Sequence, residues 1–240
     1  MSKDSISEVV VEKRLFDNVS KDLYPISLAK NCTIKEFIDH YNERNKDKLV
    51  SFIRNRFMER FIIPMDMEMN EDFKSDCKSD CKSDCKSDCK SDFLLNKYRP
   101  LKHGFCTMAI CCLMIEALQS FRKGLPDTRG QTRDVFLDFF KENKDFQLNN
   151  DCLRESFYVG VRCGILHQAE TTDGWKICRD GELISVEGKK INATKFLWEM
   201  RKVLENYCED LKRSEWNEKR GLWHNFLKKM EVIIKNCEGK

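Results

Sequence analysis

Two side chains in the C-terminal half of the chain combine an acid–base group with an anion-binding group. Arg162 and His167 lie five residues apart in the segment FYVGVRCGILHQAET, residues 157–171. An imidazole titrates near neutral pH, so it can accept or donate a proton during a reaction. A guanidinium can hold an anion through two parallel hydrogen bonds and stabilise charge that develops on it. The pair therefore has the residue types needed for acid–base chemistry at an anionic group.

The element that must position this pair is a helix. The apolar pattern predicts a helix from about Asp151 to Gln168. On a regular helix five residues advance by about 500°, so Arg162 and His167 would point about 140° apart. Two arrangements could still aim both at one group. Either Gly164 lets the helix bend, or two copies of the chain combine their pairs across a two-fold axis.

Three neighbouring side chains are candidates to support the pair. Tyr158 and Glu155 precede Arg162 by four and seven residues, so they share its helical face. Glu170 follows His167 by three residues and could orient the imidazole. A purely structural alternative uses the same residues. In that case Arg162 pairs with Glu155 or Glu170, and His167 stabilises a helix end, where a cation is favourable.

At this point the sequence resembles the HEPN superfamily of helical domains, whose hallmark is an arginine, four to six residues, and then a histidine. The matching element is Arg162-x4-His167, in a helical region of residues 97–236 that contains a strongly apolar helix before it. The family often has a polar residue, commonly asparagine, after the arginine, where this chain has Cys163. The resemblance implies a metal-independent endoribonuclease with a composite site at a homodimer interface, in a toxin or phage-defence role.

The resemblance also implies a role for each residue. His167 would be the general base or acid, and Arg162 would clamp the phosphate while a ribose 2′-hydroxyl attacks it. Cleavage would leave a 2′,3′-cyclic phosphate and a 5′-hydroxyl. The implied partners are an RNA substrate, a second copy of the chain and an antitoxin or other regulatory protein. Neither a metal nor a cofactor is expected.

Two alternatives stand beside the endoribonuclease. One is a catalytically silent HEPN-like module that binds nucleotides or proteins, and the other is a helical structural protein in which the match is accidental. An active enzyme predicts Arg162 and His167 exposed together in one cleft at a dimer interface. The silent module predicts a cleft without that pairing. The accidental match predicts Arg162 held in an internal ion pair.

The composition indicates a mainly helical globular protein. The 240 residues include 41% hydrophobic and 35% charged residues, with 4 Pro and 10 Gly to interrupt helices. The net charge of +3 is too small to indicate nucleic-acid binding by bulk electrostatics alone. The 13 cysteines are interpreted as free thiols, and the N-terminus lacks the apolar core of a signal peptide. The uncharged stretch of residues 104–115 is shorter than the roughly 20 residues of a membrane span, so a cytoplasmic protein is expected.

The chain divides into three parts. Residues 1–70 are predicted to be a separate helical segment, and residues 94–240 a helical bundle of HEPN type. Between them, residues 71–93 contain the tetrapeptide KSDC in tandem. Period four stacks like charges at i,i+4, which disfavours a helix, so a linker of variable length is predicted. A thiolate metal site made by the four repeat cysteines is the alternative.

Local signals predict the boundaries of individual elements. Thr33 and Glu36 have the spacing of a capping box, and the helical pattern that follows is expected to stop at Pro64. A central buried helix is expected over residues 104–122, ended by Gly124, and Thr132 is expected to cap the next helix. The remaining predictions are a β-hairpin at about 174–187, with strands 175–178 and 183–186, and final helices at about 195–212 and 215–236, begun by Asn192 or Thr194.

Overall fold

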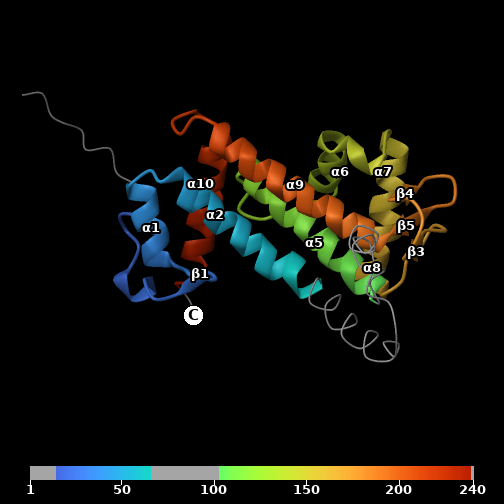
Figure 1. Ribbon diagram of the computed structural model, residues 1–240, viewed down its shortest axis with the longest axis horizontal. Coiled ribbons are helices and arrows are strands. Elements are labelled where there is room, and N and C mark those ends of the chain that lie inside the picture. The colour runs from blue at the N-terminus through green and yellow to red at the C-terminus, as the bar shows by residue number, and fades with distance from the viewer. Residues whose placement is uncertain (1–14, 66–102, 239–240) are drawn as a thin grey trace, which may run out of the picture.

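The computed structural model describes residues 15–65 and 103–238 of the chain. It is mainly helical, as predicted, with short strands at two places (Figure 1). The predicted KSDC linker, with its alternative metal site, lies outside the described residues. In chain order the elements are η1 (Lys21–Leu23), β1 (Ser27–Ala29), β2 (Cys32–Thr33), α1 (Ile34–Asn42), α2 (Lys46–Phe57), η2 (Met58–Ile62), α5 (Gly104–Lys123), α6 (Thr132–Glu142), η4 (Lys144–Phe146), α7 (Asp151–Phe157), η5 (Tyr158–Cys163), α8 (Gly164–Gln168), β3 (Lys176–Cys178), β4 (Ile184–Ser185), β5 (Lys190–Asn192), α9 (Ala193–Arg213) and α10 (Leu222–Lys235).

The predicted capping box opens α1. The Thr33 hydroxyl accepts the Glu36 N–H at 3.3 Å, and the Glu36 carboxylate accepts the Thr33 N–H at 2.7 Å. The prediction that Pro64 stops the following helix is wrong, because helical backbone continues through Met65, the last described residue before the gap. The π-helical turn η2 precedes the proline. Its wider backbone makes room where the proline ring would otherwise meet a carbonyl one turn back.

Helix α5 lies at the centre of the bundle, as the sequence predicts. It packs against α9, α10 and α6, and Gly124 ends it in the left-handed conformation with a φ of 63°. Among the described residues, α5 is long and apolar enough to cross a membrane by length and composition, but more than half of it is buried inside the fold. Core helices of globular proteins have the same composition, so its burial here accounts for its apolar character.

The predicted β-hairpin is wrong, although both of its strands exist. Strands β3 and β4 do not pair with each other. They flank β5, which is parallel to β3 and antiparallel to β4. Ile191 of β5 is fully buried opposite Ile177 and Ile184, and this burial places β5 in the middle of the sheet. The charged residues Lys189 and Lys190 come directly before Ile191, so this segment of the sequence resembles a loop and was not predicted to be a strand.

The starts of three more helices can be compared with the predictions. The cap of α6 is Gln131, and Thr132 is instead its first residue, with its hydroxyl donating to the Thr128 carbonyl at 2.8 Å. Asn192, one of the two predicted starts, caps α9 by accepting the Lys195 N–H. Helix α10 begins at Leu222 rather than at residue 215. Trp216, in the loop before this helix, packs at a tilt against Trp223, with ring centroids 4.7 Å apart.

The described part of the N-terminal segment belongs to the same hydrophobic core as the bundle. Helix α2 packs along α9 (Figure 1). Phe57 contacts Phe121 of α5 with ring centroids 5.6 Å apart. An ion pair of 2.7 Å joins Arg54 to Glu205 across the same interface. The sequence left open whether the first 70 residues pack on the bundle, and the structure places residues 15–65 on it.

Candidate active site

The helix that carries the predicted pair spans residues 151–168, as expected, but it is not regular. Asn150 caps its start by accepting the Leu153 N–H at 2.9 Å, and α7 continues without a break into the π-helical segment η5 and then α8. At the end of η5 the Gly164 N–H is directed at the carbonyls of Val159, five residues back, and Val161, three residues back, rather than at the carbonyl four residues back. Such wide turns insert one extra residue into a helix and are frequent at functional sites.

This π segment brings Arg162 and His167 together within one chain. The guanidinium Nη1 lies 3.4 Å from the imidazole Nε2. Arg162 lies in the last π turn and His167 in the α-helical turn that follows, so the segment that joins them departs from the regular helix for which a divergence of about 140° is expected. The contact forms within a single copy of the chain. The combination of two such pairs across a two-fold axis stays a prediction.

Arg162 is also held from the opposite side by Glu116 of α5. Its Nη2 and Nε lie 2.8 and 2.9 Å from the carboxylate Oε1. Both side chains are only 14% exposed. Burial acts to lower the pKa of Arg162, but the hydrogen bond and negative charge of Glu116 outweigh it, so the pKa is raised. The arginine stays charged and is fixed in direction, with Nη1 left toward His167.

The sequence contains a signal that could have identified Glu116. It is the only charged residue between Gly104 and Phe121, in the most apolar segment of the chain. A single carboxylate in a buried helix requires a partner, because an unpaired buried charge is costly. Here the partners are Arg162 and the hydroxyl of Thr128, which donates to Oε2 at 3.3 Å.

The three predicted supporting residues are placed differently. Tyr158 lies beside the pair, with the Arg162 guanidinium 5.7 Å from its ring centroid, a cation–π contact. Glu155 instead pairs with Arg133 of α6, at 2.6 Å, and so takes no part in holding Arg162. Within the described residues the polar neighbour of the His167 imidazole is Arg162, whereas the Glu170 carboxylate accepts the Thr171 N–H at 3.0 Å.

No protein-family model, curated protein or solved structure matches this chain. The case for a site therefore depends on the geometry of its own side chains. Among the described residues, histidine, cysteine, aspartate and glutamate form no group of three or more that could hold a metal ion. What the geometry offers is an exposed imidazole touching a fixed, charged guanidinium, which is suited to proton transfer at an anion.

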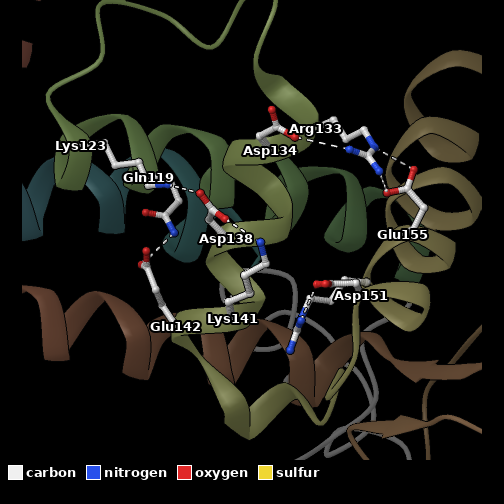
Figure 2. Close-up of polar contacts among 10 residues, drawn as sticks. Gln119, Lys123, Arg133, Asp134, Asp138, Lys141, Glu142, Asp151 and Glu155 are labelled. Carbon is white, nitrogen blue, oxygen red and sulfur yellow. Dashed lines mark hydrogen bonds and ion pairs between the residues drawn. The ribbon is translucent and has the colours of Figure 1, made fainter.

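A polar network fixes the helices that carry the site relative to one another (Figure 2). Lys123 of α5 contacts Asp138 of α6 at 2.5 Å, and buried Gln119 donates to Glu142 at 3.0 Å. Asp138 has a lowered pKa, chiefly because Lys123 donates a hydrogen bond to its carboxylate. The Arg133–Glu155 pair then joins α6 to α7. Through these contacts α5, which carries Glu116, is linked to the helix that carries Arg162 and His167.

Proposed function

We propose that this protein is a metal-independent endoribonuclease of HEPN type, in which Arg162 and His167 act on one phosphodiester. The observation that carries the proposal is the 3.4 Å contact between the guanidinium Nη1 and the imidazole Nε2. His167 is exposed, so it can reach a ribose 2′-hydroxyl or a leaving 5′-oxygen on an RNA strand. A phosphate placed against both side chains would receive charge stabilisation from Arg162 while His167 transfers the proton.

The two sides of the Arg162 guanidinium would have separate roles. The Nε and Nη2 atoms face Glu116, which fixes the direction of the side chain. The Nη1 atom faces His167 and is the one available to a phosphate oxygen. A preorganised donor of this kind loses little entropy when the substrate binds, and preorganisation is the main source of electrostatic catalysis.

We propose a homodimer because apolar side chains are exposed beside the site. Phe105 and Leu113 on α5 and Val159 on η5 are each more than two fifths exposed. Leu113 lies one turn before Glu116, on the same part of α5. Association of two copies through this face would bury these side chains and bring the two sites near each other. An antitoxin or other regulatory protein is the proposed partner that would restrain such an enzyme.

A silent binding module is the second candidate. The Arg162–Glu116 ion pair is the feature expected of an accidental match, but Arg162 touches His167 as well. If Glu116 satisfies the guanidinium fully, a phosphate gains little from it. The two candidates differ in whether the Nη1 atom of Arg162 is used.

Cleavage of total RNA and tRNA in EDTA by the purified protein would test the proposal. The variants are His167→Ala and Arg162→Lys, which keeps a charge opposite Glu116 but loses the planar guanidinium. We expect wild-type cleavage with cyclic-phosphate ends and a loss of about 100-fold or more in both variants. Glu170→Gln is the matched control and should retain activity, because this exposed carboxylate contacts the Thr171 N–H and not the pair. No cleavage by folded wild-type protein, or cleavage that survives in both variants, would refute this site.

A further inference from the structure

A loop crosses the π-helical segment at two glycines. Residues 170–175, here called the strap, pass over Gly160 and Gly164, which lie four apart on one helix face. A Cβ on Gly160 would lie 2.5 Å from Trp175 Cδ1 and 2.8 Å from the Thr172 carbonyl oxygen. A Cβ on Gly164 would lie 2.5 Å from the Glu170 carbonyl oxygen. Only glycine at both positions lets the strap come this close.

The strap supplies the hydrogen bond that the π segment leaves out. Because the Gly164 N–H is directed at Val159, it does not serve the Gly160 carbonyl, which would be its acceptor in an α-helix. The Thr172 N–H donates to this carbonyl at 2.8 Å. A buried carbonyl without a donor is costly, so this bond compensates the wide turn directly.

Several side chains anchor the strap in this position. Trp175 is buried and its indole N–H donates to the Ser156 hydroxyl at 3.1 Å. The Ser156 hydroxyl in turn donates to Asp173 at 2.6 Å, and Lys189 holds the same carboxylate at 2.9 Å. Asp173 and Ala169 adopt left-handed backbone, with φ of 53° and 55°, which is unfavourable for non-glycine residues. The anchors thus hold a strained loop in place that begins three residues after His167.

We propose that the strap selects the π register of the helix and thereby sets the Arg162–His167 contact. In a regular α register the Gly160 carbonyl would accept from Gly164, and the Thr172 N–H would have to share this acceptor. The same change would remove the extra residue that η5 inserts before α8 and would rotate Arg162 relative to His167. The Thr172 amide and the Trp175 side chain are therefore positioning groups. The expected effect of the strap on catalysis rests on the proposed function, whereas its effect on the helical register does not.

The test replaces Gly160 with alanine, whose methyl group would push Trp175 and the Thr172 carbonyl away. Trans-hydrogen-bond NMR couplings report which carbonyl accepts from the Gly164 amide. In wild-type protein we expect coupling to Val159, and in Gly160→Ala to residue 160, with faster hydrogen exchange at the Thr172 amide. Val159→Ala is the matched control, because it changes the adjacent, exposed side chain and should keep the wild-type pattern. A folded Gly160→Ala protein that retains the Val159 coupling would overturn the proposal.

A milder variant keeps the test decisive if Gly160→Ala does not fold. Ser156→Ala removes both contacts of the hydroxyl without adding volume, and we expect the Gly164 amide to show both couplings. A pure wild-type coupling together with a freely exchanging Thr172 amide would again contradict the proposal. If the wild type cleaves RNA, kcat of Gly160→Ala should fall about 100-fold with KM little changed. A register change without any wild-type cleavage would refute the proposed function and leave the role of the strap intact.

Discussion

At the scale of single residues, Arg162 has two partners that contact different sides of its guanidinium. Glu116 fixes the guanidinium from the core side, and His167 meets it from the solvent side. The sequence predicted the arginine, the histidine and Tyr158 as neighbours. The isolated charge of Glu116 in an apolar helix indicates that it needs a partner, but the sequence did not predict that the partner is Arg162, because the contact between α5 and η5 depends on tertiary packing.

Glu116→Gln should destabilise the protein. The amide keeps the shape of the side chain but leaves the mostly buried Arg162 charge without its counterion. We expect the free energy of unfolding at pH 7 to fall by about 1.5–3 kcal/mol, the range for hydrogen bonds to charged groups. Urea denaturation followed by circular dichroism measures this. Glu170→Gln, at an exposed position, should stay within about 0.5 kcal/mol of wild type, and equal stability of the two variants would contradict the prediction.

At the scale of elements, local signals predicted helices better than strands. The capping box at Thr33, the apolar helix α5 and the span of residues 151–168 each follow from spacing along the chain. The π segment η5 could not be predicted, because its missing hydrogen bond is compensated by the strap rather than by helical neighbours. The predicted pairing of the strands was wrong for a related reason. Pairing of β5 with β3 joins residues that are not adjacent in sequence, whereas hairpin signals describe only adjacent strands.

Removal of the capping box should weaken the start of α1. Thr33→Ala deletes the hydroxyl that accepts the Glu36 N–H, and we expect a loss of about 1 kcal/mol in the free energy of unfolding. Thr33→Ser keeps the acceptor and should lose only a few tenths of a kcal/mol. Chemical denaturation of the three proteins side by side measures the difference. Equal losses in both variants would show that the methyl group, not the cap, is what matters.

The contact of α5 with α6 should depend on pH through Asp138. Its pKa is lowered below the ordinary 3.8, first by the hydrogen bond from Lys123, so folding favours the ionised carboxylate. Its contribution is therefore fully present above pH 3.8 and is lost as the pH falls through the lower pKa of the folded state. Asp138→Asn should be less stable than wild type at pH 6, by about 1 kcal/mol or less at this partly exposed site. Urea titrations at pH 6 and pH 3 should show the difference shrinking in acid, and a constant difference would contradict the assignment.

At the scale of the whole molecule, the core is continuous from Phe16 to Cys237 among the described residues. The sequence identified which side chains are apolar, and most of them are buried. It did not show that α2 lies along α9, because amphipathic faces predict burial but not the partner that covers them. The exposed apolar residues are therefore informative, since their own chain leaves them uncovered.

Leu113→Glu should separate the proposed dimer. Leu113 is 48% exposed, so a charge there costs the monomer little but disfavours burial between two copies. We expect the mass from light scattering after gel filtration to fall from two chains to one. Leu15→Glu is the control, since Leu15 is 39% exposed and lies at the end of the molecule where α1 packs. A wild type that is already a monomer, or a Leu113→Glu protein that stays dimeric, would contradict the proposed face.

The two edges of the gap between the described ranges lie together. The Thr107 hydroxyl is 3.7 Å from Met65 Sδ, so the chain leaves the bundle and returns to it at nearly the same point. The closure entropy of such a connection changes slowly with its length, by about 0.6 kcal/mol for each doubling. A flexible linker there, as the sequence predicts, would gain or lose copies of the KSDC unit with little penalty to the helices on either side. The length of such a tract could drift between generations while the bundle and its paired side chains stay the same.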